Sequence, residues 1–378
     1  MRVKLGDVAS ESRETLRRDK LGLPTVGLEH LIPGELSLTA WNVDDDSTFT
    51  KTFRKGQILF GRRRAYLHKA AIAPFDGICS SDITVIEALP DKLLPELLPF
   101  VIQNDTFFDF AVGKSAGSLS PRVKWEHLSQ FDFELPPIAE QRKLADLLWA
   151  ANAAKEAYKK LITVTDELVK SQFIEMFGDP MTNPMGWKVE RLGDLGKIGS
   201  SKRVFTSDFT ETGIPFYRGT EVVQLSFGEY IEPKYYISEE HYASLKEATG
   251  VPSIGDLLLP SICAKGEVWR VDNDSPFYFK DGRVLWIHLE AQDIDSEYLC
   301  YALQDKLIRD FGEIASGTIF AEMKIVLLKE INIFIPPLPL QNRFADFVRA
   351  ADKSKFALQR ALNELEATYT SLLRENLG

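Results

Sequence analysis

The residues that most often carry out catalysis or bind metals form no such pattern in this sequence. Gly113-Lys114-Ser115 resembles the end of a phosphate-binding P-loop, but Phe108 stands where that motif requires a glycine. No zinc-protease, nucleophile-elbow or dinucleotide-binding motif occurs, and the three cysteines form no C-x-x-C pair. Five histidines lack the spacing of metal ligands, and we interpret them as surface or hydrogen-bonded residues: His30, His68, His127, His241 and His288. The sequence therefore predicts a chain without a catalytic site, a cofactor or a metal of its own.

Composition limits the class of protein further. The chain has 378 residues, enough for two or more domains, and 44% of them are hydrophobic, as in an ordinary globular protein. No apolar run reaches the roughly 18–20 residues that a membrane helix needs, and the N-terminus has no signal-peptide pattern, so we expect a cytoplasmic location. The net charge of −10 argues against a protein that simply coats nucleic acid. Any DNA-binding face must be a local basic patch.

The strongest feature of the sequence is a phrase that occurs twice. Leu135–Leu148 reads LPPIAEQRKLADLL, and Ile335–Val348 reads IPPLPLQNRFADFV. Each copy is followed by a long run without Gly or Pro. Identical residues lie 200 positions apart, among them Pro136 and Pro336, Gln141 and Gln341, Ala145 and Ala345, and Asp146 and Asp346. A repeat of this length indicates a duplicated domain with its helix rather than a short solenoid repeat.

Both long runs have the heptad pattern of a coiled coil. The first helix is predicted to begin near Ile138 and to end at Gly178-Asp179-Pro180. Its predicted seam consists of Leu144, Leu148, Ala151, Lys155, Tyr158 and Ile162, and continues to Gln172. The seam of the second helix consists of Phe344, Val348, Ala351, Lys355, Leu358 and Leu362, and continues to Leu372. We expect an antiparallel pair in which Lys155 and Lys355 meet and fix the register.

The segments before the helices are predicted to be two related globular regions. Short apolar runs such as 56–60 and 83–86 read as strands, and framework pieces such as Lys4-Leu-Gly-Asp7 and Arg191-Leu-Gly-Asp194 recur. The predicted domains are residues 1–136, a spacer helix 137–180, residues 181–335 and a second spacer helix 336–378. The fold class is α+β, with two α/β globular domains in a pseudo-two-fold arrangement, separated by two long antiparallel helices. Because the halves agree in framework and differ in loops, we predict two binding modules with different specificities.

This combination of features resembles the specificity (S) subunits of type I restriction–modification systems. The resemblance rests on the doubled Pro-Pro…Gln…Ala-Asp phrase at the head of each long helix, on the Gly/Ser-rich loops before it, and on Gly186-Trp187-Lys188…Leu192-Gly193-Asp194. It covers nearly the whole chain, although the first module begins at Met1 without a Gly-Trp-Lys sequence. In that family each globular region is a target-recognition domain, and the helices fix the distance between the two domains.

The resemblance implies a non-catalytic subunit that reads a bipartite sequence in double-stranded DNA. Its expected partners are two methyltransferase subunits, which would methylate adenine, and restriction/translocase subunits. S-adenosylmethionine, ATP and Mg are expected on these partner subunits and not on this chain. The alternative is a two-module protein-binding scaffold, or an anti-restriction inhibitor that acts through the helical pair. The acidity of the chain fits this alternative better, whereas its arginine cluster and divergent loops fit it less well.

The candidate DNA contacts of the first module are cationic and small polar residues. Arg62, Arg63 and Arg64 directly follow the predicted strand at 56–60, and Lys69 is close by. Arginine can bind a guanine edge or a phosphate through two hydrogen bonds. A second set lies in and after the Gly/Ser-rich loop: Lys114, Ser115, Ser118, Arg122 and Lys124. The alternatives are a solvated loop with incidental charge for the first set and an ordinary turn for the second.

In the second module the candidate contacts are chosen by equivalent position. They are Ser261, Lys265, Arg270, Ser316, Thr318 and Lys324.

Overall fold

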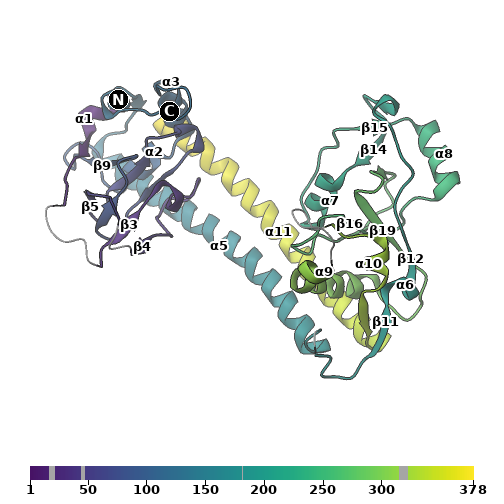
Figure 1. Ribbon diagram of the computed structural model, residues 1–378. Coiled ribbons are helices and arrows are strands. Elements are labelled where there is room, and N and C mark those ends of the chain that lie inside the picture. Colours follow the sequence, from purple (N-terminus) through teal and green to yellow (C-terminus); the bar gives the residue numbers. More distant parts are fainter. Residues whose placement is uncertain (17–21, 44–46, 181, 315–321) are drawn as a thin grey trace. The chain divides into compact units, whose positions relative to one another are not determined.

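A computed structural model describes residues 1–16, 22–43, 47–180, 182–314 and 322–378 (Figure 1). The chain forms two compact units. Unit 1 contains residues 1–161 and 358–378, and unit 2 contains residues 162–357. Each unit thus holds one globular domain together with a part of both long helices.

The globular part of unit 1 is built on two small sheets. The first is antiparallel and has the order β2-β9-β6-β7, with bounds Ala9–Ser12, Ile83–Ala88, Ile58–Gly61 and Ala70–Ile72. The second has the order β4-β3-β8-β5, with bounds Asn42–Val43, Pro24–Val26, Gly77–Cys79 and Lys51–Phe53. β1 (Arg2–Lys4) pairs with β10 (Asp132–Glu134), which brings the start of the domain to its end. The predicted strands at 56–60 and 83–86 correspond to β6 and β9.

Helices and short turns complete this domain. They are α1 (Leu5–Val8), η1 (Leu28–His30), η2 (Ala65–Leu67), α2 (Leu98–Ile102), α3 (Asp105–Gly113) and α4 (Trp125–Leu128). α2 is entirely buried, and its Phe100 belongs to the same apolar core as Phe60 of β6 and Phe107 of α3. The core therefore lies between the first sheet and the helices that follow β9.

Unit 2 repeats the strand order of the first sheet but not that of the second. Its first sheet has the order β12-β19-β16-β17, with bounds Gly196–Gly199, Val284–Leu289, Leu257–Pro260 and Trp269–Arg270. Its second has the order β13-β15-β14-β18, with bounds Phe209–Thr210, Tyr236–Ile237, Ile214–Tyr217 and Tyr278–Phe279. β11 (Lys188–Arg191) pairs with β20 (Asn332–Ile335) as β1 pairs with β10. The duplication seen in the sequence is therefore a duplication of the fold.

The helices of unit 2 show where the two copies differ. α6 (Leu192–Leu195) and α10 (Ile325–Lys329) occupy the places of α1 and α4, and α9 (Ser296–Ile314) follows β19. α7 (Gly219–Ser226) and α8 (Glu239–Thr249) are inserted around β15, together with the short turn η3 (Thr206–Asp208). The insertions lie outside the shared framework, so loops have changed while the sheet has been kept.

The two long helices are α5 (Ile138–Phe177) and α11 (Leu338–Leu377). In unit 1, Leu144 and Leu148 share a core with Leu373 and Leu377. In unit 2, Phe173 and Phe177 each place their ring centroid 5.4 Å from that of Phe344. In both units the start of one helix lies beside the end of the other, so the predicted antiparallel packing is confirmed. No helix among the described residues is long and apolar enough to cross a membrane.

The predicted seam positions lie on the covered side of each helix, and the covered side shifts by one residue near the C-terminal ends. Leu144, Leu148, Phe344, Val348, Ala351 and Leu362 are buried, and Ala151, Tyr158, Ile162 and Leu358 are half-buried. Near the C-termini, however, Phe173 and Leu373 are buried and their neighbours Gln172 and Leu372 are only half-buried. These helix ends pack on a globular core rather than only on the other helix, which changes the face that is covered.

The seam lysines do not meet, contrary to the prediction. Lys155 Nζ lies 5.3 Å from the centre of the Tyr369 ring, a cation–π distance. Lys355 Nζ is 2.5 Å from Asp166 Oδ1. In an antiparallel pair, a residue near the start of one helix faces a residue near the end of the other. Residues at the same position face one another only at the midpoint of such a pair, and the contacts of Lys155 with Tyr369 and of Lys355 with Asp166 place this midpoint beyond both lysines, so each has its own partner.

The repeated glutamine of the Pro-Pro phrase joins each long helix to its domain. The buried Gln141 accepts a hydrogen bond from Leu94 N (2.9 Å) and donates to the carbonyls of Lys92 (3.1 Å) and Pro136 (3.0 Å). Gln341, also buried, makes the same three bonds in unit 2, with Asp295 N at 2.8 Å, Asp293 O at 3.0 Å and Pro336 O at 2.7 Å. The repeat is thus explained by one hydrogen-bonded joint that occurs in both units.

Candidate nucleic-acid interface

The three successive arginines of unit 1 occupy the turn between β6 and η2 and differ in their surroundings. Arg62 is held by its backbone, with N donating to Asp82 O (2.9 Å) and O accepting from Val123 N (3.0 Å). Its side chain is half-buried, and among the described residues its buried Nε has no hydrogen-bond partner. Arg64 is exposed and has a left-handed backbone with φ +55°. These two guanidinium groups are thus free of the carboxylates that the structure describes.

Arg63 and Arg122 converge on one carboxylate. Arg122 Nε lies 2.7 Å from Asp82 Oδ1, and Arg63 reaches Asp82 Oδ2 at 3.4 Å and Ser120 Oγ at 3.0 Å. Burial alone would raise the pKa of Asp82, but the hydrogen bonds and charges of the two arginines outweigh it and lower the pKa. This ion cluster fixes the Gly/Ser-rich loop against the turn after β6. Both arginines thus have a clear structural role.

The rest of the first candidate set divides into free and occupied side chains. Lys69 Nζ donates to Leu28 O at 2.6 Å, and Ser115 Oγ donates to Ala111 O at 2.9 Å. Ser118 is exposed, and the exposed Lys114 places Nζ 5.6 Å from the centre of the Phe110 ring. Lys124 is exposed at the N-cap of α4. Lys114 and Lys124 are therefore better placed than Lys69 to bind an external anion.

The candidates of unit 2 are more often structural. Ser261 is buried, and Arg270 Nη2 makes a 2.7 Å ion pair with Glu297 Oε2 in which both side chains are mostly covered. Burial raises the pKa of Glu297 although Arg270 opposes the shift. These placements argue against DNA contact by Ser261 and Arg270. Lys265 and Lys324 are exposed, and Lys324 stands at the N-cap position of α10 as Lys124 does at that of α4. Ser316 and Thr318 lie outside the described residues.

An ion pair of reversed polarity occupies the same place in the two units. Ser261 N donates to Arg283 O and Ser261 O accepts from Met323 N, the same backbone bonds that Arg62 makes with Asp82 and Val123. Position 283 is thus the counterpart of Asp82. In unit 2 its arginine pairs with Glu322, whereas in unit 1 the aspartate pairs with Arg122. The connection between the two segments is kept while its charges are exchanged.

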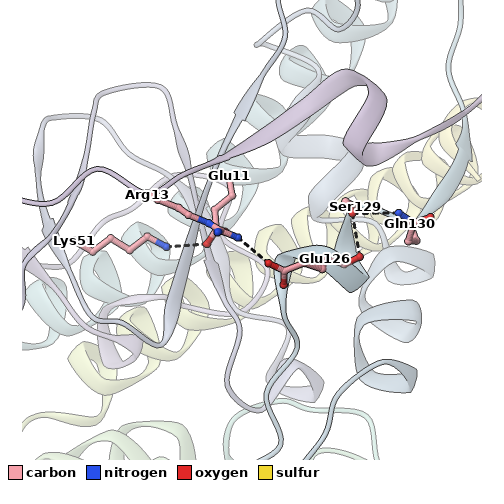
Figure 2. A network of polar contacts seen from close by, with 6 residues as sticks. All are labelled: Glu11, Arg13, Lys51, Glu126, Ser129 and Gln130. Atoms are coloured by element: carbon pink, nitrogen blue, oxygen red, sulfur yellow. Dashed lines mark hydrogen bonds and ion pairs between the residues drawn. The ribbon is translucent and has the colours of Figure 1, made fainter.

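A groove in unit 1 contains residues that the sequence did not single out. It has a volume of about 840 Å³ and lies among β2, β5, the turn after β6, and α4. Arg13 Nε is 2.7 Å from Glu11 Oε2 and its Nη2 is 2.8 Å from Glu126 Oε1, while Lys51 Nζ is 3.2 Å from Glu11 Oε1 (Figure 2). Glu11, Lys51 and Glu126 are far apart in the chain, so no local spacing could have indicated the network.

The described residues contain no group of histidine, cysteine and acidic side chains that could hold a metal ion. The three cysteines are free and buried. Burial raises the pKa of the Cys79 thiol to about 12, which leaves it unreactive at neutral pH. What these surfaces offer is charge, hydrogen-bonding groups and aromatic rings for binding.

Part of the chain matches the model of a known family, and curated relatives of similar description match as well. Residues 184–367 match the family model described as "Type I restriction modification DNA specificity domain". The MjaIX specificity subunit of a type I restriction enzyme from Methanocaldococcus jannaschii is 25% identical over 90% of this chain and 80% of its own length. The EcoDI specificity subunit from Escherichia coli is 28% identical over 39% of this chain and 33% of its own length.

Solved structures agree with these relatives in fold. A chain from a study of complex assembly and conformational transition of the type I R-M system has a TM-score of 0.57 and 21% identity, and covers 100% of this chain and 97% of its own. The type I S subunit from M. genitalium has a TM-score of 0.62 and 13% identity, and covers 100% of this chain and 96% of its own. The expected resemblance to specificity subunits and the expected mixed fold with paired long helices are thus confirmed. The matched relatives and the M. genitalium structure are described as specificity subunits of type I systems.

Proposed function

We propose that this chain, whose residues 184–367 belong to the type I restriction–modification DNA specificity domain family, reads a two-part DNA sequence and docks two methyltransferase subunits. Each globular domain would read one part. The observation that carries the proposal is one sheet framework, built twice, that carries different loops and different exposed side chains. Bases are distinguished by side chains in the grooves, so loops that differ on a common framework would recognise different bases.

The second part of the proposal concerns the outer face of the long helices. Five positions outside the seam carry the same or similar residues in α5 and α11: Lys143 and Arg343, Asp146 and Asp346, Leu147 and Phe347, Ala150 and Ala350, Ala157 and Ala357. They follow the spacing of one helix face, and all are exposed except the half-buried Phe347. Packing within the chain does not require these exposed residues to agree. A face that occurs twice would bind two copies of the same partner.

The reading of DNA is tested by methylation in cells. The chain is expressed with its methyltransferase partner in cells that lack related systems, and methylated bases are mapped across the genome. We expect one new methylated sequence made of two specific parts separated by unspecified bases. A continuous methylated sequence, or no new methylation from a complex that assembles, would overturn the proposal.

The docking face is tested by charge reversal. Asp146→Arg and Asp346→Arg change one copy each, and the exposed Glu167→Arg on α5 serves as the control. Native mass spectrometry of the co-expressed complex should find two partner subunits with the wild type and the control. Either single variant should retain one partner subunit, and the double variant none. Two partner subunits on the double variant would refute this docking face.

A further inference from the structure

We propose that the groove of unit 1 holds the DNA of one half-site, with Lys124 on a phosphate and Arg62 on a base edge. This inference rests on the proposed DNA-reading function and adds where one domain grips its target. The groove is lined by residues from segments that are distant in sequence, among them Lys51, Arg62 and Lys124. Its volume of about 840 Å³ is in the range of ligand-binding clefts, so it is large enough to take part of a DNA strand.

The charges of the groove favour an anionic ligand. Four cationic side chains line it, Arg13, Lys51, Arg62 and Lys124, against two carboxylates, Glu11 and Glu126. The chain as a whole has a net charge of −10, so this local excess of positive charge is opposite in sign to the net charge of the chain. A groove that concentrates positive charge attracts a polyanion locally even when the protein is acidic overall.

The carboxylates of the groove are already occupied, which identifies the cations that remain for a ligand. Glu11 binds both Arg13 and Lys51, and Glu126 binds Arg13 (Figure 2). Among the described residues, Arg62 and Lys124 have no carboxylate within ion-pair distance. The network thus holds the wall of the groove and leaves two cations for DNA.

Arg62 and Lys124 differ in a way that assigns their roles. The backbone of Arg62 is fixed at both N and O, its side chain is half-buried, and its buried Nε has no partner among the described residues. A donor held in place without a partner is suited to a base edge, where geometry decides between bases. Lys124 is exposed at the N-cap of α4, and its flexible point charge suits a phosphate.

The remaining lining has the chemistry of nucleic-acid contact. Thr15, Thr48, Thr50 and Ser81 supply hydroxyl groups that both donate and accept hydrogen bonds. Phe49 and Trp125, both half-buried, add aromatic surface of the kind on which bases and sugars pack.

The equivalent surface of unit 2 has different side chains. β12 pairs with β19 as β2 pairs with β9, which places Ser200 at the position of Arg13. α10 follows Lys324 as α4 follows Lys124, which places Val326 at the position of Glu126, with 71% of its surface exposed. The second domain thus lacks the Arg13–Glu126 pair. Changes in the groove should consequently affect one half-site only.

The test selects sequences from DNA duplexes randomised over several helical turns, using the full-length chain. The variants are Arg62→Ala, Arg62→Lys and Lys124→Ala. The control is Arg2→Ala with Lys4→Ala, which removes two exposed cations of β1 outside the groove. Thermal unfolding of each protein verifies that it is folded. Binding to a non-selected duplex is measured over a range of salt concentrations.

The wild type and the control should both select a two-part sequence. Both Arg62 variants should discriminate between bases roughly tenfold to hundredfold less well in one part of the sequence and as well as the wild type in the other part. Arg62→Lys should have this effect because a lysine cannot reproduce the two parallel hydrogen bonds of an arginine. Lys124→Ala should still select both parts of the sequence. The slope of the logarithm of its binding constant against the logarithm of the salt concentration should become smaller in magnitude by about 0.9, the value for one phosphate contact. If folded Arg62 variants select both parts unchanged, or lose both equally, the groove does not read a half-site. A wild type that selects no two-part sequence would instead overturn the proposed function itself.

Discussion

The glutamine joint at the start of each long helix provides the most quantitative prediction. Replacing Gln341 with leucine keeps a similar volume and removes three hydrogen bonds, to Asp295 N, Asp293 O and Pro336 O. Each net bond is worth about 1 kcal/mol, and an orphaned buried donor such as Asp295 N costs about 1–3 kcal/mol. We therefore expect Gln341→Leu to lower the free energy of local unfolding by about 3 kcal/mol.

Hydrogen exchange is the suitable assay because a chain with two units does not have to unfold in one step. Exchange in peptides that cover residues 293–299 and 336–345 should become faster by roughly a hundredfold, the rate equivalent of about 3 kcal/mol. Gln359→Leu is the matched control, since Gln359 is exposed on the same helix and donates a hydrogen bond to Asn363 of that helix. The control should change the free energy of local unfolding, as measured by exchange, by less than about 0.5 kcal/mol.

The twin joint makes this prediction stricter. Gln141→Leu removes the same three bonds in unit 1, to Leu94 N, Lys92 O and Pro136 O. Gln141→Leu should therefore lower the free energy of local unfolding by the same amount as Gln341→Leu, within about 1 kcal/mol. If either variant costs no more than the exposed control, the glutamine does not join helix and domain, and the hydrogen-bonded joint does not explain why the phrase is repeated.

Two further predictions concern ion pairs. Lys355→Met removes the pair with Asp166, and because both side chains are partly exposed, urea unfolding should change by less than about 1 kcal/mol. Arg122→Glu sets a carboxylate beside Asp82 and should destabilise unit 1. Adding Asp82→Arg gives the pair the polarity that it has in unit 2, and a double-mutant cycle should show that this double variant recovers most of the lost stability. Because the arginines lower the pKa of Asp82, its stabilising effect should be present above the ordinary aspartate value of about 3.9 and be lost as pH falls through the lower folded-state value.

The sequence predicted those parts of the fold that depend on local signals. Strand β6 is apolar and ends at a turn, and α5 begins after Pro136-Pro137 and ends before Gly178. Both could therefore be located from their composition and from the Gly and Pro residues that bound them. The antiparallel pairing of the helices followed from the duplication, because a duplicated unit closes on itself through an approximate two-fold axis. The strand and the helix bounds need only neighbouring residues, which is why they could be derived without a structure.

The candidate site was predicted less completely because its parts meet only after folding. Arg63 and Arg122 were named in two separate sets of candidates, and the carboxylate that binds both, Asp82, follows a different strand. Likewise, nothing in the sequence joins Arg13 to Glu126, which lies 113 positions away. The partners of a surface arginine decide whether it is structural or available, and these partners are set by the sheet topology.

The reversed ion pair shows what the duplication has constrained. If folding requires only that an ion pair connects these two segments of each unit, the positive residue can stand on either segment. The two units have opposite arrangements: Asp82 with Arg122, and Arg283 with Glu322. The joint at Gln141 and Gln341 has no such freedom, because its partners are backbone groups whose donors and acceptors cannot be exchanged. A duplicated fold should accordingly keep side chains that bind backbone and vary those that bind other side chains. The surfaces that could distinguish one DNA half-site from another belong to the second kind, so they can change without loss of the framework that presents them.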